Sequence, residues 1–292
     1  MYELIQLTDR TYYIKTPTNV GVIRTSPNEV CLIDSGRNED EARLTYERIR
    51  EKDWKVAAIY NTHSHADHIG GSHYIQQVTG CKVYLTPTEI DLALHPCLEP
   101  SLLYGAYPPR DLRNWYIMAD KCDLDYLTDD RLPPGLTMFR LPGHVFHMVG
   151  FRTEDGVVFL ADAIMGQKTL ERHPITFLYD TGSYLETLRM IKKMDGDIYV
   201  PSHAEALKDI ATLAHLNIDK LKEVADRIVE FCEEPLTFEE ILQKLVLFYH
   251  LRLNFLQYAI IGSTVRSYLA WLKDIGRLEV DYEDGRMQWK AL

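Results

Sequence analysis

The stretch Asn61-Thr62-His63-Ser64-His65-Ala66-Asp67-His68 places three imidazoles and one carboxylate within six residues. It follows Val56 to Tyr60, an apolar run that predicts a buried strand. Neutral imidazole is the commonest protein ligand for zinc, and carboxylates suit harder divalent cations. The alternative is a polar loop that is rich in histidine by chance, but the 292 residues include only 11 histidines. The stretch therefore predicts a metal site at the end of a strand.

Side-chain direction divides this stretch into two sets of ligands. Successive residues of an extended segment point to opposite sides, so His63 and His65 share one side. Asp67 and His68 then turn toward a second position, so one loop is expected to serve two metal ions. The Gly70-Gly71 pair that follows lets the backbone approach the site closely, because glycine has no Cβ.

The composition, 46% hydrophobic and 26% charged, is that of a soluble globular protein. A length of 292 residues is enough for one large and one small domain. No apolar run is long enough to span a bilayer, and residues 1–10 lack the pattern of an export signal. Five scattered cysteines in no Cys-x-x-Cys pair favour a reducing cytoplasm over disulfides. A net charge of −11 argues against nucleic acid as the main partner and favours a small-molecule substrate.

Ligand-type side chains also follow four other predicted strands. They are Asp34 after 30–33, His144 after 136–141, Asp162 after 157–160 and His203 after 198–200. Open α/β sheets place their sites at the carboxyl ends of strands, so we expect these side chains to meet the histidine cluster at one edge. For Asp34 the alternative is to cap the surface helix predicted from Glu39 to Glu51.

These motifs, in this order, resemble the five-part signature of the metallo-β-lactamase superfamily, with His-x-His-x-Asp-His at 63–68 as its centre. The resemblance covers residues 1–205 and implies an α/β (α+β) fold, an αββα sandwich of two mixed sheets with helices outside. It also implies a ligand set. One metal ion would be held by His63, His65 and His144, the other by Asp67, His68 and His203, with Asp162 bridging the two and Asp34 orienting the loops from behind.

Such a site leaves room for a water shared by two cations, which would lower the pKa of that water toward about 7. We therefore predict a dinuclear metal-dependent hydrolase of a small ester, thioester or lactone, with Asp67 and Asp162 as its catalytic carboxylates. The two divalent ions would be zinc, or alternatively iron or manganese. The resemblance disfavours a true β-lactamase, because those enzymes lack the aspartate at position 162.

Two other functions are alternatives. A metal-dependent endonuclease or phosphodiesterase acting on RNA or DNA would need a basic groove, against which the acidic balance counts. A regulator that only senses metal would need an incomplete ligand set.

Several further residues near these motifs are assigned from local pattern. Thr86-Pro87-Thr88-Glu89 predicts a capping box with proline at the first helical position. The insertion at about 92–133 is the least regular part, and its aromatic residues predict either a lid or pocket wall, or packing and an oligomer contact. These are Tyr104, Tyr107, Trp115 and Tyr116. Four other candidates match no ligand position of the family and are expected to have packing or loop roles, namely His73, His147, Lys168 and Tyr179.

Residues 206–292 are predicted to form a separate small domain. Helices are expected at 207–232, from 237 onward, at 255–260 and at 263–275, followed by a hairpin across Asp284-Gly285. This arrangement resembles a winged helix. Some members of the superfamily end in such a domain, and they form a branch that is related to glyoxalase II but distinct from it. The segment has 11 basic and 14 acidic residues, so we expect it to pack on the catalytic domain or form a homodimer rather than bind nucleic acid.

Overall fold

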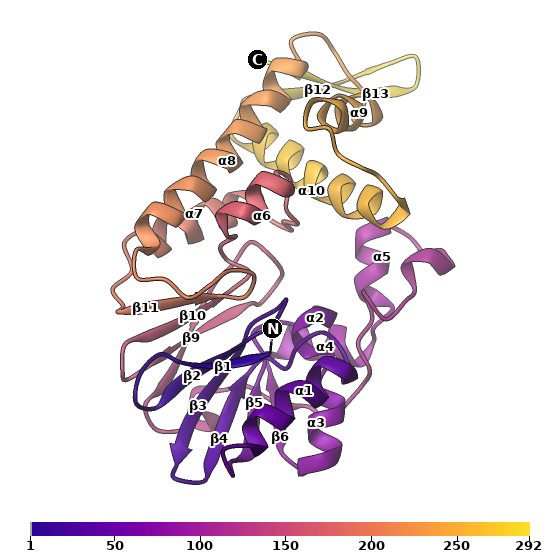
Figure 1. Cartoon of the computed structure of the whole chain (residues 1–292). Coiled ribbons are helices and arrows are strands. Elements are labelled where there is room, and N and C mark those ends of the chain that lie inside the picture. The colour runs from indigo at the N-terminus through magenta and orange to yellow at the C-terminus, as the bar shows by residue number, and fades with distance from the viewer. Residues whose placement is uncertain (1) are drawn as a thin grey trace.

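A seven-stranded mixed sheet forms one half of a sandwich in the computed structural model, which describes residues 2–292 (Figure 1). Its strands follow one another in chain order, antiparallel from β1 to β4 and parallel from β4 to β7. Their bounds are β1 (Glu3–Gln6), β2 (Thr11–Lys15), β3 (Val20–Ser26), β4 (Glu29–Ile33), β5 (Lys55–Tyr60), β6 (Lys82–Leu85) and β7 (Asp125–Tyr126). Met1, the first residue of the predicted catalytic domain, lies outside the described residues.

The second sheet has four strands in the order β11-β10-β9-β8. They are β8 (Leu136–Arg140), β9 (Val149–Thr153), β10 (Val157–Ala161) and β11 (Ile198–Pro201). Only β10 and β11 pair in parallel, so this sheet is mixed as well. Apolar side chains of both sheets, among them Ile33 and Tyr60 from the first and Phe151 and Phe159 from the second, pack into one buried cluster. The predicted sandwich of two mixed sheets is confirmed.

Helices cover the outer faces of the two sheets. Those associated with the first sheet are α1 (Glu39–Arg50), α2 (Ala66–Ile69), α3 (Ser72–Thr79) and α4 (Pro87–Leu94). Helices α6 (Gln167–Arg172) and α7 (Thr181–Ile191) connect β10 and β11 of the second sheet. Helix α1 illustrates why they form: Asn38 accepts a hydrogen bond from the Glu41 amide as N-cap, and the buried face packs Ala42 and Ile49 against the sheet.

The insertion at 92–133 is more helical than expected. It contains α5 (Leu98–Tyr104) and the short 3₁₀ helices η1 (Arg110–Leu112) and η2 (Asp129–Arg131), besides β7. The capping box predicted at its entrance is wrong. Proline does stand at the first helical position of α4, but the Thr86 hydroxyl donates to the His147 carbonyl instead of capping the helix, and the buried Glu89 carboxylate accepts from Ser64 and from the His147 amide.

The C-terminal segment consists of three helices and a hairpin. These are α8 (Ile210–Phe231), α9 (Phe238–Phe248), α10 (Phe255–Asp274), β12 (Leu278–Glu283) and β13 (Arg286–Ala291). The two helices predicted at 255–260 and 263–275 are one continuous helix. Glycine inside a helix costs only about 1 kcal/mol, and buried contacts of Ile261, Val265 and Leu269 on either side of Gly262 outweigh it.

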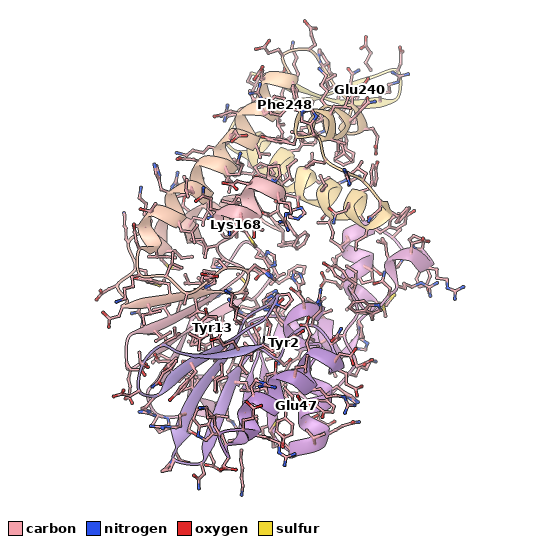
Figure 2. The ribbon with its side chains drawn as sticks, in the orientation of Figure 1. Tyr2, Tyr13, Glu47, Lys168, Glu240 and Phe248 are labelled. Atoms are coloured by element: carbon pink, nitrogen blue, oxygen red, sulfur yellow. The ribbon has the colours of Figure 1, made fainter. Side chains whose placement is uncertain are left out.

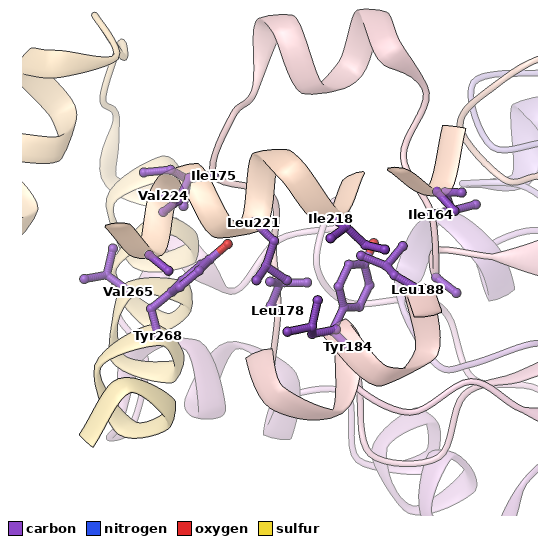
Figure 3. Close-up of a cluster of buried hydrophobic side chains, with 14 of the residues drawn as sticks. Ile164, Ile175, Leu178, Tyr184, Leu188, Ile218, Leu221, Val224, Val265 and Tyr268 are labelled. Carbon is purple, nitrogen blue, oxygen red and sulfur yellow. The ribbon is translucent and has the colours of Figure 1, made fainter. Parts of the chain in front are cut away.

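One hydrophobic cluster joins this segment to the sandwich. It extends from Leu141 to Trp289 and crosses the domain boundary predicted between residues 205 and 206. Figure 3 shows its centre, where side chains before the boundary meet side chains of α8 and α10. The labelled residues are Ile164, Ile175, Leu178, Tyr184 and Leu188 on one side and Ile218, Leu221, Val224, Val265 and Tyr268 on the other. The boundary and the winged-helix resemblance stay predictions.

No helix among residues 2–292 has both the length and the apolar character that crossing a membrane requires.

Candidate metal centre

The ends of five strands place polar side chains at one edge of the sandwich. In chain order they are β4 with Asp34, β5 with the stretch 63–68, β8 with His144, β10 with Asp162 and β11 with His203. The seven ligand-type side chains form two groups, and within each group the ligand atoms lie within 4.8 Å of one another. The groups are His63, His65, His144 and Asp162, and Asp67, His68 and His203.

Close backbone contacts hold the stretch 63–68 in place. A Cβ on Gly70 would lie 2.0 Å from the Arg37 carbonyl oxygen, and one on Gly71 would lie 2.2 Å from the Ser35 carbonyl oxygen. Any other residue would therefore push the junction between α2 and α3 away from the loop that follows β4. The Gly70-Gly71 pair has the role that the sequence predicts.

Asp162 contacts members of both groups. Its Oδ1 lies 3.3 Å from Nε2 of His68, and its Oδ2 lies 3.3 Å from Nε2 of both His144 and His203. The carboxylate thus stands between the two groups, where the sequence predicts a bridging ligand. That the seven residues hold metal ions remains a prediction.

Asp34 fixes two of the imidazoles from behind. Its Oδ1 accepts a hydrogen bond of 2.7 Å from the Thr62 amide, and its Oδ2 accepts one of 2.8 Å from Nδ1 of His68. The Thr62 hydroxyl also donates to Oδ2 and lies 3.0 Å from Nδ1 of His63. Because Nδ1 of each ring is held in this way, Nε2 is left to face the centre.

The other three imidazoles are also held through one ring nitrogen. Nδ1 of His144 donates to the Phe177 carbonyl at 3.1 Å, and Nδ1 of His203 donates to the Pro17 carbonyl at 2.9 Å. His65 has the opposite orientation. Its Nε2 lies 3.1 Å from Oε1 of Glu99, so that Nδ1 faces Nε2 of His63 at 3.0 Å. Metal-binding histidines commonly have such an acceptor on the far nitrogen.

Burial and neighbouring carboxylates divide the imidazoles into two electrostatic classes. Burial lowers the pKa of His144 to about 3 and that of His63 well below its ordinary value, so both rings are neutral. Burial also opposes the charge on His68, but Asp162 and Asp34 outweigh it and raise the pKa to about 10. Likewise Asp162 raises the pKa of His203 against the effect of burial. Without metal, the neighbouring carboxylates therefore favour the protonated forms of His68 and His203.

Two buried atoms of the centre lack hydrogen-bond partners. They are Nε2 of His68 and Oδ1 of Asp162, which face each other without forming a hydrogen bond. Buried polar atoms are normally paired, so these two atoms call for a further partner. A divalent cation would satisfy both, and imidazole and carboxylate are donors that zinc, iron and manganese accept. The residues present therefore fit a metal ion.

A cavity of about 320 Å³ lies directly on this centre. His65, Asp67, His144, Asp162 and His203 form its floor. Its walls and roof are mostly apolar and come from the insertion, from the segment after β10 and from the first half of α10. Among these residues are Leu103, Tyr116, Ile117, Met165, Ile175, Phe177, Ile260 and Ile261. The C-terminal segment thus closes the cavity that the strand ends open.

The aromatic residues of the insertion have different places. All four are exposed, but Tyr116 also lines the cavity as a wall residue, whereas Tyr104, Tyr107 and Trp115 do not. Tyr104 packs near Phe255 at the start of α10, with ring centroids 6.1 Å apart.

The four candidates without a family position lie outside the centre. His73 contacts the Lys121 carbonyl, and the amide of His147 donates to Glu89. Tyr179 packs on Phe146, and Lys168 on α6 lies between the sandwich and the C-terminal helices (Figure 2). None of them lines the cavity or belongs to the two groups.

Three residues of the site are not predicted by the sequence motifs. Glu89 accepts hydrogen bonds from the Ser64 amide and hydroxyl and from the His147 amide, which ties the β5–α2 loop to the loop that carries His144. Glu99 holds His65, and the Thr18 hydroxyl donates to Oδ2 of Asp67 at 2.9 Å. Only the full burial of Glu89 marks it as unusual, and burial is not visible in the sequence.

Structures of known proteins share this fold. A β-lactamase domain protein from Burkholderia ambifaria is 17% identical with a TM-score of 0.72, and the match covers 99% of this chain and 94% of that chain. A metallo-β-lactamase family protein from Thermus thermophilus is 17% identical with a TM-score of 0.73, over 98% of this chain and 100% of that chain. The C-terminal segment is thus part of the similarity.

A further similarity covers less of the chain. BJP-1, a subclass B3 metallo-β-lactamase of Bradyrhizobium japonicum, is 21% identical with a TM-score of 0.56, over 76% of this chain and 93% of that chain. A search of curated proteins gave no match. The family model described as "Metallo-beta-lactamase superfamily" matches residues 13–203, which include all seven ligand-type residues. The chain therefore belongs to the metallo-β-lactamase superfamily.

Proposed function

We propose that the protein is a dinuclear metal-dependent hydrolase that acts on a small, uncharged ester, thioester or lactone centre. The observation that carries this proposal is the convergence of five imidazoles and two carboxylates at one place, where three of the imidazoles and both carboxylates form the floor of one cavity. Two buried atoms there, Nε2 of His68 and Oδ1 of Asp162, form no hydrogen bond within residues 2–292. His63, His65 and His144 would hold one cation and Asp67, His68 and His203 the other, with Asp162 between them.

A pair of divalent cations held here would supply Lewis acidity, which lowers the pKa of a water and balances charge on a reacting oxygen. The chain itself supplies orientation. Carboxylate oxygens of Asp67 and Asp162 can accept the hydrogens of the attacking water, and Thr18 fixes Asp67. In the overall reaction the water oxygen bonds to the acyl carbon, the C–O or C–S bond breaks, and the proton leaves with the alcohol or thiol.

The cavity walls support an acyl substrate over a phosphodiester. Besides the histidines, the charged groups among the described lining residues are three carboxylates, Asp67, Glu99 and Asp162, and no lysine or arginine is among them. A phosphodiester brings negative charge and is recognised by clustered positive charge. An uncharged acyl group instead matches apolar walls such as Leu103, Ile117 and Ile260, which also exclude water from the reacting atoms.

We also propose an architectural role for residues 206–292. Ile260 and Ile261 on α10 roof the cavity, and the core of α8 and α10 is continuous with that of the sandwich. The segment would then form the substrate site instead of a separate nucleic-acid module.

The test begins with metal analysis of the purified protein and continues with a substrate panel. We expect about two divalent ions per chain and turnover of at least one ester, thioester or lactone. Bis(p-nitrophenyl) phosphate and single-stranded RNA serve as the competing substrates. No turnover of any acyl substrate, together with clear cleavage of RNA, would establish the alternative, a metal-dependent endonuclease or phosphodiesterase.

A further inference from the structure

A second cavity adjoins the one above the metal centre. It has a volume of about 300 Å³ and shares four lining residues with the first cavity, so the two meet along a common wall. The shared residues are His173, Ile175, Gln257 and Ile261. The remaining lining comes from the end of α6 and from the loop between α9 and α10, namely Arg172, Tyr249, His250, Leu251 and Arg252.

The charged side chains that line the two cavities have opposite sign. The first contains three carboxylates and no arginine or lysine, whereas the second contains Arg172 and Arg252 and no carboxylate among its described lining residues. Both arginines are exposed, and the ion pairs within residues 2–292 give neither of them an acidic partner. In a chain with a net charge of −11, two unpaired guanidinium groups at one hollow are a local reversal of sign.

The loop that carries Arg252 has a constrained backbone. His250 has a φ of 53°, in the left-handed region that costs a residue with a Cβ roughly 1 kcal/mol or more. Just beyond it, Asn254 caps α10 by accepting a hydrogen bond of 2.8 Å from the Gln257 amide. The turn between α9 and α10 is thereby fixed, and Arg252 and Gln257 on either side of the cap both line the second cavity.

We propose that the second cavity binds an anionic group, a phosphate or a carboxylate, on the part of the substrate that leaves after hydrolysis. This rests on the proposed function, because it places the reacting carbonyl on the floor of the first cavity. The substrate is then elongated. Its uncharged acyl portion lies between the apolar walls, and its charged end passes His173 and Gln257 to reach Arg172 and Arg252. Guanidinium groups bind phosphate and carboxylate oxygens with charge-assisted, often bidentate hydrogen bonds.

The kinetic test uses three thioesters with the same acyl group and a thiol portion that ends in a phosphate, a carboxylate or a methyl group. The variant is Arg172→Gln/Arg252→Gln, and the control is Arg286→Gln, which removes an equally exposed arginine from β13. We expect the wild-type kcat/KM for one of the two anionic thioesters to exceed that for the methyl thioester about tenfold or more, because KM is lower. The double variant should lose that preference and keep its rate on the methyl thioester. Which of the two anionic thioesters the wild type prefers shows whether the cavity favours phosphate or carboxylate.

A binding test separates this proposal from the hydrolase itself. Butane-1-sulfonate, a weak metal ligand, is titrated onto the metal-loaded protein beside the uncharged butyl methyl sulfone. We expect the sulfonate to bind the wild type and Arg286→Gln equally, and the double variant about tenfold more weakly. Such binding without turnover of any acyl substrate would support the cavity and refute the hydrolase. Equal turnover of all three thioesters without sulfonate binding would overturn the anion site alone. Cleavage of an RNA oligonucleotide that requires both arginines would overturn it in favour of a phosphodiester backbone.

Discussion

The floor and the roof of the first cavity are built on different principles. The floor consists of imidazoles and carboxylates at strand ends, and each of its imidazoles has a partner on the ring nitrogen that faces away from the centre, as His144 has the Phe177 carbonyl. The roof consists of ordinary apolar side chains such as Ile117 and Ile260, carried by the insertion and by α10. Only a few residue types can bind a metal ion and so form the floor, whereas any apolar group of suitable size can form the roof.

This difference suggests a division of labour. The floor would determine which reaction is catalysed, and the roof would determine which acyl groups bind above the floor. Glu99 is where the two meet, because it belongs to the insertion and holds His65 on the floor. Changes to the floor should therefore alter metal content, and changes to the roof should alter KM.

Removing the bridging candidate tests the floor most severely. Asp162→Ala deletes the carboxylate that contacts His68, His144 and His203, so we expect metal content to fall from about two ions toward one per chain. Hydrolysis should fall about 1000-fold or more, because both the charge balance and the orientation of the water are lost. Metal analysis and steady-state rates are the measurements. Unchanged metal stoichiometry would contradict a bridging role.

Proton release on metal binding tests the electrostatics of the same floor. Carboxylates raise the pKa of His68 to about 10 and that of His203 well above its ordinary value, so both rings are protonated near pH 7 without metal. Metals bind neutral imidazole, so each proton must leave. The apparent association constant should therefore rise with pH below about 10, by about tenfold per pH unit for each proton released.

Calorimetry in buffers of different ionisation enthalpy counts these protons directly. A metal affinity that does not change between pH 6 and pH 8 would show that the imidazoles are already neutral.

Glu99 tests whether the roof supports the floor. Glu99→Leu removes the acceptor on Nε2 of His65, and we expect metal affinity to weaken about 10- to 100-fold, as with other supporting partners of metal ligands. Glu99→Gln keeps an acceptor oxygen and should lose less. Competition with a chromophoric chelator measures both. Glu47→Leu, on the exposed face of α1, is the control (Figure 2), and equal losses for the leucine and glutamine variants would exclude the hydrogen bond as the cause.

The same contrast explains what the sequence could and could not predict. The histidines and Asp162 were recognisable because few residues bind metals and because each follows an apolar strand. For Glu89 the Thr-Pro-Thr-Glu pattern predicts a capping residue, since the same pattern begins many helices, and only the fold shows Glu89 bound to Ser64 and His147. The roof carries no local signal, because an isoleucine that lines a cavity looks like any other apolar residue of a helix.

A roof substitution should have the smallest effect and the most selective one. Ile260→Ala removes part of the apolar wall contributed by α10, and the lost contact is about 1 to 2 kcal/mol for an acyl chain that reaches it. We expect KM for long-chain thioesters to rise about 5- to 20-fold, with little change for an acetyl thioester and none in metal content. Leu247→Ala, at an exposed position of α9, is the matched control. Equal losses of kcat/KM on short and long acyl chains would mean that Ile260 acts through the position of α10 and not through contact with the substrate. The division between floor and roof would then not hold where α10 meets the cavity.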